Sequence, residues 1–158
     1  MPVNVKHVKN RRAIQYRSLD DLVQDARQLC QSQVRTLGNK SYGEILEHLA
    51  VCMNGCIDGS KLKIPWPIRT VARLLKKRIL NGGLSPGFRH TRANDALVWT
   101  QHPLDCQVAF AKVEQAVKRL QAETKRSSHP VLGKLSHEEW NTFHLRHSEM
   151  HMSFVVPE

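Results

Sequence analysis

Apolar residues recur along this chain at the three- and four-residue spacing of amphipathic helices. Four long stretches carry such an apolar stripe: residues 18–37, 41–59, 104–122 and 136–154. Ser18, Ser41 and Ser136 each stand three residues before an acidic side chain. This is the spacing of a helix capping box, so we expect helices to begin at these serines. No strand pattern is convincing, and the stretches predict an all-α four-helix bundle.

The connection between the second and third long helices spans more than forty residues. Prolines 65 and 67 mark its first part as a connection, and residues 68–80 resemble a short basic helix lying over the domain. Residues 84–102 show little periodicity, so we expect a loop with one turn around residues 95–99. A connection of this length suits a crossover between parallel neighbours better than a hairpin.

A short basic segment precedes the first stripe. Residues 1–17 form a basic arm that either packs on the domain or stays mobile, and residues 18–158 form a single bundle domain. Residues 129–133 form a turn before the last helix, and we expect the ring of His129 to lie outside the bundle.

Composition places the protein among ordinary globular chains. Hydrophobic residues make up 41% and charged residues 24% of its 158 residues. No apolar run approaches the length of a membrane span, and the first residues lack the core of a signal peptide, so we expect a cytoplasmic protein without a membrane partner. The four cysteines lack paired zinc spacing and are expected to be free thiols: Cys30, Cys52, Cys56 and Cys106.

The formal net charge of +10 permits contact with nucleic acid or an anionic surface. Nucleic acid is not favoured, because aromatic residues are only 6% and no base-stacking or helix-turn-helix motif is present. The cations of residues 69–78 are expected on a solvated helix face, although Arg69 or Arg73 would suit a phosphate or carboxylate substrate if the crossover covers the site. The tryptophans are expected in the core or a pocket wall: Trp66, Trp99 and Trp140.

Three histidines interrupt the apolar stripe of the last helix. His144, His147 and His151 fall within an arc of roughly 60° on a helical wheel. Buried imidazoles need partners for their ring nitrogens, and these can be backbone groups, water or a transition metal. His147 and His151 have the i, i+4 spacing that lets one helical turn present two nitrogens to one ion.

A third ligand must come from another helix, and His48 is the leading candidate because it lies at the edge of the second apolar stripe. Three imidazoles would leave a position for water or a thiol, whose pKa the ion would lower. They suit zinc, nickel or iron alike, so the metal is a divalent transition metal of open identity. His48, Cys52 and Cys56 offer a rival row on the same helix.

His144 lies one turn before His147, so ligation by all three histidines of the last helix is strained. It is a candidate fourth ligand, a group that orients another imidazole, or an acid/base facing the substrate. We predict a catalytic role in proton transfer for His144.

Two motifs resemble the DinB/YfiT-like superfamily. The first is Ser41-Tyr-Gly-Glu-Ile-Leu-Glu-His48-Leu-Ala, followed by Ile57-Asp-Gly. The second is His129-Pro-x-x-Gly-x-Leu-Ser136-x-Glu-Glu-Trp140 followed by His144-x-x-His147-x-x-x-His151, and it is similar to a subgroup known as domain of unknown function 1569. The resemblance implies an up-down-down-up bundle with a divalent metal on His48, His147 and His151.

Some members of that superfamily are thiol-dependent transferases or isomerases, so the resemblance leads us to expect a metal-dependent enzyme. Transfer involving a low-molecular-weight thiol and hydrolysis of a small molecule are the reactions we consider. We also consider a homodimer, since bundles of this family type commonly pair. The alternative is a non-catalytic bundle whose basic surface binds nucleic acid or an acidic partner.

Overall fold

The computed structural model describes residues 1–158 and is mostly helical, with seven α-helices, one short 3-10 helix and a two-stranded sheet. The four long helices are α1 (Leu19–Cys30), α2 (Tyr42–Asp58), α6 (Cys106–Ala122) and α7 (His137–Met152). The shorter elements are η1 (Val5–His7), β1 (Val34–Thr36), α3 (Trp66–Leu74), α4 (Lys76–Gly82), α5 (Arg92–Val98) and β2 (Val155–Pro157). None of the helices is both long and apolar enough to cross a bilayer.

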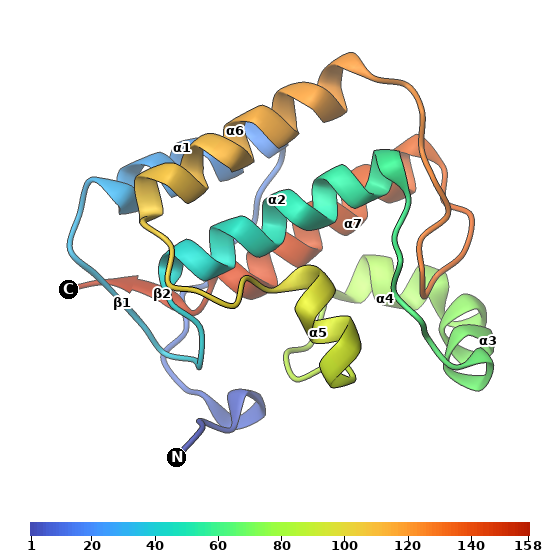
Figure 1. The fold of residues 1–158 in the computed structure, drawn as a ribbon, viewed down its shortest axis with the longest axis horizontal. Helices are drawn as coiled ribbons and strands as arrows, with labels where there is room; N and C mark the ends of the chain where they lie inside the picture. The colour runs from blue at the N-terminus through green and yellow to red at the C-terminus, as the bar shows by residue number, and fades with distance from the viewer.

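The long helices pack around one core (Figure 1). Each contacts two others, in the cyclic order α1, α6, α2, α7. In the view of Figure 1, α1 and α7 run from right to left, whereas α2 and α6 run from left to right. The short helices α3, α4 and α5 lie below α2 and α7 in the same view. The crossover between α2 and α6 therefore covers the side of α2 and α7 that faces away from α6.

The predicted helix starts are confirmed by their caps. Ser18, Ser41 and Ser136 each accept a hydrogen bond from a backbone N–H three residues on, and the acidic side chain at that position bonds back to the cap. These reciprocal bonds satisfy N–H groups that a helix end leaves unpaired. Local sequence alone therefore fixes where three of the four long helices begin.

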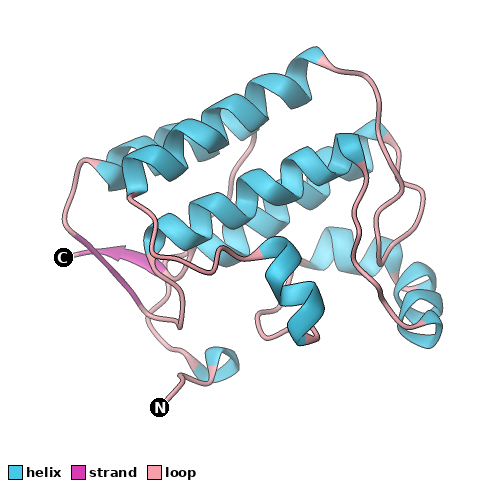
Figure 2. Cartoon of the chain, in the orientation of Figure 1, coloured by secondary structure: helices cyan, strands magenta, loops and turns pink.

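The end of the first helix was predicted wrongly, and so was the absence of strands. α1 ends at Cys30, and β1 then pairs antiparallel with β2, opposing Val34 to Pro157 and Thr36 to Val155 (Figure 2). Branched side chains such as valine and threonine favour extended backbone. The partner strand lies at the other end of the chain, so helical periodicity could not reveal the pairing.

The crossover also differs from its predicted form. The single helix expected over residues 68–80 is two helices, because the backbone at Leu75 leaves the helical region between α3 and α4. An ion pair of 2.8 Å between Lys76 and Glu139 ties the start of α4 to α7. The turn expected around residues 95–99 is the helix α5, and α6 begins at Cys106 with Asp105 as its cap.

The N-terminal arm packs on the bundle, which was one of its two predicted states. Arg12 donates two hydrogen bonds of 2.8 Å to the carboxylate of Asp25 on α1. The side chain of Tyr16 is buried, and its backbone N–H donates to Glu149 on α7 at 2.7 Å. The arm thereby joins α1 to α7. The proposed domain boundary at residue 18 stays a prediction.

Gly43 marks the closest approach between α2 and the segment that leads into α6. A Cβ atom added at Gly43 would overlap the carbonyl of Leu104, whereas a Cβ added at Gly55 of the same helix meets nothing within 4 Å. Only glycine therefore lets the first turn of α2 lie against the backbone before α6.

We predict that Gly43→Ala lowers the free energy of unfolding by about 1–3 kcal/mol or more, because backbone must move to admit the methyl group. Gly55→Ala is the matched control and should raise it by up to about 1 kcal/mol, since alanine is the better helix former. Urea unfolding followed by circular dichroism measures both. Equal stability of the two variants would contradict the close approach at Gly43.

Candidate metal centre

Two antiparallel helices bring the predicted ligands together. α2 carries His48 on the face that packs on α7, and α7 carries His147 and His151 on consecutive turns. His48 is buried, and the other two rings are half-buried at one wall of a cavity. The apolar stripes of α2 and α7 pack on each other, so the histidines within these stripes face one another.

Two contacts between Nε2 atoms link the three histidines through His147. Nε2 of His147 lies 3.3 Å from Nε2 of His48 and 3.1 Å from Nε2 of His151. The rings stand edge to face, at 65° between His48 and His147 and at 87° between His147 and His151. Nitrogens bound at about 2.0–2.1 Å to a tetrahedral zinc ion lie about 3.3–3.4 Å apart, so this spacing fits a shared ion.

Hydrogen bonding among the three rings cannot explain their arrangement. Nδ1 of His48 lies 2.9 Å from the carbonyl of Val98, and a carbonyl only accepts, so Nδ1 carries the proton of His48. Nε2 of His48 therefore presents a lone pair to His147. A neutral His147 has at most one proton on Nε2, which cannot point at both neighbours in good geometry. A cation at the meeting point would satisfy all three lone pairs.

Burial keeps the three imidazoles neutral. Desolvation lowers the pKa of His48 to about 4, and it lowers the pKa values of His147 and His151 well below their ordinary range. Neighbouring imidazoles lower the pKa of His147 further. Neutral imidazole is the form that binds metal, so the cluster is ready for an ion at neutral pH.

The crossover orients His48. The indole of Trp99 stacks on the ring of His48 with centroids 4.0 Å apart and planes 9° from parallel. Behind it, the buried amide of Asn94 accepts from the backbone N–H of Lys63 at 3.0 Å and donates to the carbonyl of Lys63 at 2.9 Å. These two bonds join α5 to the start of the crossover and hold Val98 and Trp99 against His48.

Cys52 is a member of the cluster that the sequence underrated. Its Sγ atom lies 3.7 Å from Nε2 of His48, and the ligand atoms of His48, Cys52 and His147 all lie within 4.8 Å of one another. Burial raises the pKa of the Cys52 thiol to about 12. The i, i+4 spacing from His48 was the available signal. Of the rival row, Cys56 is buried but is not a member of this group.

His144 lies apart from the converging nitrogens. Its ring is 1% exposed and stacks on Trp140, with centroids 5.3 Å apart and planes 21° from parallel. Its Nε2 atom is buried without a hydrogen-bond partner. The residue is not part of the cavity wall. Its predicted catalytic role stays a prediction, and its surroundings are those of the core.

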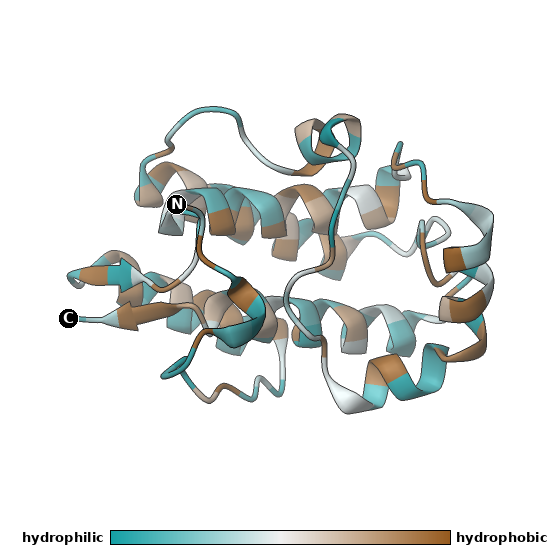
Figure 3. Ribbon diagram, turned by 90° about the horizontal axis from the view of Figure 1, so that it is seen from below, coloured by the Kyte–Doolittle hydropathy of each residue, from teal (hydrophilic) through white to brown (hydrophobic).

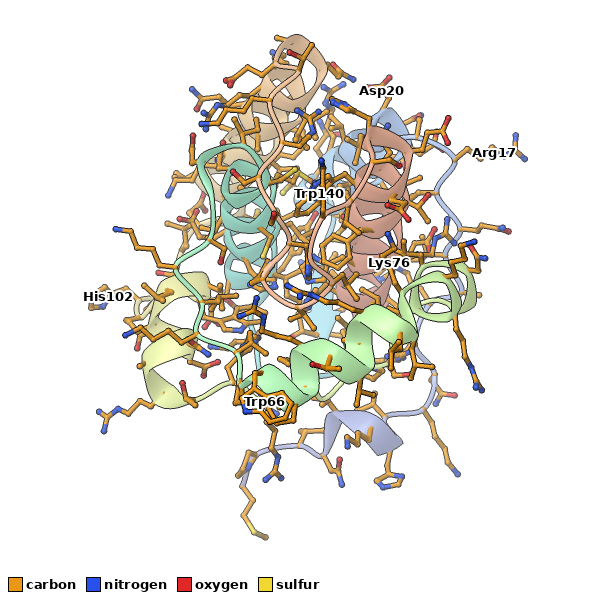
Figure 4. The ribbon with its side chains drawn as sticks, turned by 90° about the vertical axis from the view of Figure 1, so that its right-hand side faces the viewer. Arg17, Asp20, Trp66, Lys76, His102 and Trp140 are labelled. Atoms are coloured by element: carbon orange, nitrogen blue, oxygen red, sulfur yellow. The ribbon has the colours of Figure 1, made fainter.

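A cavity of about 730 Å³ extends from the histidines between α2, α7 and the crossover. Its wall is largely apolar and includes Trp99, Phe143 and Phe154, while Lys40 and His90 bring polar groups to it. Trp140 also lines it, as predicted for a pocket residue, and Figure 4 shows this side chain in the interior between α2 and α7. Neither Arg69 nor Arg73 is in the wall, although Ile68 and Ala72 of the same helix are.

The prediction that the ring of His129 lies outside the bundle was wrong. The ring packs on Phe143 with centroids 4.4 Å apart, and its Nδ1 accepts hydrogen bonds from the backbone N–H groups of Val131 and Leu132 at 3.1 and 2.9 Å. An acceptor nitrogen cannot carry a proton, and burial lowers the pKa of His129 to about 4.

We predict that His129 makes the protein less stable in acid. An unfolded histidine binds a proton below about pH 6.5, whereas folded His129 resists protonation down to about pH 4, so stability falls by up to about 1.4 kcal/mol per pH unit within that window. His129→Asn keeps an acceptor for the turn but does not titrate, so unfolding of the chelator-treated protein should depend less on pH. The exposed His102→Asn is the control, and equal slopes in all three proteins would refute the assignment.

Comparison with known proteins identifies the family of this chain. Residues 8–158 match the family described as "Protein of unknown function (DUF1569)". No curated protein and no solved structure gives a significant match to the chain. The DUF1569 family is generally placed in the DinB/YfiT-like clan, the superfamily that the helix motifs resemble. Because the match covers nearly the whole chain, the protein belongs to the DUF1569 family.

Proposed function

We propose that this protein is a metal-dependent enzyme of the DinB-like type, with one divalent transition metal held by His48, His147 and His151. The observation that carries the proposal is that Nε2 of His147 lies 3.3 Å from Nε2 of His48 and 3.1 Å from Nε2 of His151, beside the group of ligand atoms formed by His48, Cys52 and His147. Zinc, nickel and iron all suit three imidazoles. The proton on Nδ1 of His48, donated to the carbonyl of Val98, is the outer hydrogen bond expected of a metal-binding histidine.

We further propose that the four long helices form the up-down-down-up bundle of that superfamily, with the crossover between α2 and α6. The helix directions in Figure 1 support this order. In such a bundle α2 and α7 are antiparallel neighbours, which is the relation that a shared site between His48 and His147 requires.

A bound ion of this kind supplies Lewis acidity that lowers the pKa of water or a thiol at its open position. The chain does the rest. The Val98 carbonyl and the Trp99 indole orient His48, and the apolar wall around Phe143 limits water near the site. The cavity favours a small, largely apolar substrate, and thiol-dependent transfer and hydrolysis are the reactions we propose. The four free cysteines favour a reducing compartment such as the cytoplasm.

Cys52 decides whether the site is open. Three histidines leave a position for water or substrate, as in catalytic zinc sites, whereas a fourth ligand from Cys52 would close it, as in structural ones. We propose the open site, with Cys52 as a neighbour of the three histidines and not a fourth ligand. Burial raises the pKa of its thiol to about 12 without an ion, and a bound ion would lower that pKa, so substitution of Cys52 decides between the two sites.

The alternative, a non-catalytic bundle with a basic binding surface, also has one observation in its favour. Residues 59–94 hold nine lysines and arginines and no acidic residue. Binding of nucleic acid or an acidic partner by that surface would survive substitution of the histidines and weaken steeply with salt.

We predict that the purified, untagged protein binds one metal ion per chain and that His48→Ala, His147→Ala and His151→Ala each abolish stoichiometric binding. The loss should exceed the roughly 10–100-fold weakening expected from losing an outer hydrogen-bond partner. Elemental analysis and zinc titration calorimetry measure it. The exposed His137→Ala on α7 is the matched control and should keep one ion per chain. Stoichiometric metal in the His147→Ala variant would place the site elsewhere.

Cys52→Ala separates the open site from the closed one. We predict that this variant keeps one ion per chain and that its affinity for the ion falls by no more than about tenfold. Loss of a direct ligand would lower the affinity further. If Cys52→Ala loses its metal as completely as His147→Ala, then the thiol is a ligand and the ion is structural. The enzyme proposal would then fail while the metal site stands.

A further inference from the structure

The positive charge of this protein is concentrated in one segment. Residues 59–94 contain nine of the 24 lysines and arginines but none of the 14 acidic residues. The nine are Lys61, Lys63, Arg69, Arg73, Lys76, Lys77, Arg78, Arg89 and Arg92. Only Lys76 forms an ion pair, with Glu139. Eight cations in this segment therefore have no acidic partner within the molecule.

The same segment holds most of the large apolar side chains that are exposed. Six of the ten lie in it: Trp66, Ile68, Val71, Leu74, Leu75 and Phe88. Leu74 is 82% and Trp66 is 75% exposed, so the prediction that Trp66 lies in the core or a pocket wall was wrong. Figure 4 shows Trp66 at the outer edge of the molecule, far from Trp140 in the interior.

Three of these apolar side chains share one face of α3. On a helical wheel, Trp66, Leu74 and Val71 lie within an arc of roughly 140° that contains no charged residue. Ala72, on the opposite side, is buried and lines the cavity. Arg69 and Arg73 lie beside the apolar arc. One side of α3 therefore faces the cavity, and the opposite side is exposed and apolar with cations beside it.

The rest of the basic segment lies on the same side of the bundle. α3, α4 and α5 all cover the side of α2 and α7 that faces away from α6 (Figure 1). Seen from that side in Figure 3, hydrophobic and hydrophilic residues alternate on the short helices at the right. We call this surface, formed by α3, α4 and residues 59–65, the basic apolar face.

We propose that the basic apolar face docks on the surface of an anionic lipid bilayer. Trp66, Val71 and Leu74 would enter the interfacial layer, and exposed cations of the neighbouring helix α4, such as Lys77 and Arg78, would meet lipid phosphates. A helix with an apolar face flanked by lysine and arginine lies in the bilayer interface, and each nearby cation adds electrostatic attraction to anionic lipid. This peripheral docking involves no spanning helix, and it departs from the expectation that the protein has no membrane partner, which rested on the lack of such a helix.

Two other occupants fit the face less well. A second copy of this chain would bring like charges together, because the cations surround the apolar patch on both partners. A nucleic acid would complement the cations but would gain little from the exposed aliphatic side chains of Val71 and Leu74. Of these three occupants, the anionic bilayer alone complements both the cations and the apolar side chains. The proposal does not depend on the metal site.

Vesicle flotation of the full chain tests the proposal. We expect binding to vesicles of phosphatidylcholine containing about one third phosphatidylserine, and little binding to phosphatidylcholine alone, at near-physiological salt. Trp66→Ser with Leu74→Ser should weaken partitioning about tenfold or more. Lys77→Glu should weaken it at least about fivefold. These side chains are exposed, so circular dichroism should show an unchanged fold.

Matched controls lie on α6, away from the face. Val108→Ser removes an exposed apolar side chain and Lys118→Glu reverses an exposed charge, and both should leave partitioning unchanged. Equal loss in these controls would overturn the proposal, as would absence of binding to the anionic vesicles. Self-association that Leu74→Ser abolishes, without vesicle binding, would assign the face to a second copy. Binding of RNA or DNA that ignores the Trp66 and Leu74 changes, without vesicle binding, would assign it to nucleic acid.

Discussion

The structure depends on three imidazoles at the cavity wall, one buried and two half-buried, that cannot satisfy one another. His48 gives its only proton to the carbonyl of Val98, so its Nε2 lone pair faces His147, which in turn faces His151. Such an arrangement is costly where the rings are shielded from water unless a cation lies among the nitrogens. The antiparallel packing of α2 on α7 places these histidines on facing turns, where the core would otherwise be apolar.

The crossover orients His48 from the side opposite α7. Asn94 bonds both backbone groups of Lys63, and this fixes α5 so that Val98 and Trp99 meet His48. The segment thus encloses the cavity and orients one ligand. Its outer surface contacts no other part of the bundle. Unpaired cations and apolar residues such as Leu74 are therefore exposed there.

The helices and the candidate ligands could be predicted because their signals are local. Capping boxes fixed the starts at Ser41 and Ser136, and helical spacing placed His147 and His151 on one face. The strand at Val34–Thr36 could not be predicted, since its partner is distant in sequence. Exposure of Trp66 could not be predicted either, because both sides of α3 carry apolar residues and only the packing shows which side is buried.

X-ray absorption at the metal edge of the wild-type protein, loaded with one equivalent of zinc, tests the central claim most directly. A shared site on the three histidines predicts a first shell of nitrogen and oxygen at about 2.0–2.1 Å with the outer-shell pattern of several imidazoles. A first shell led by sulfur at about 2.3 Å, or an oxygen shell without the imidazole pattern, would contradict it.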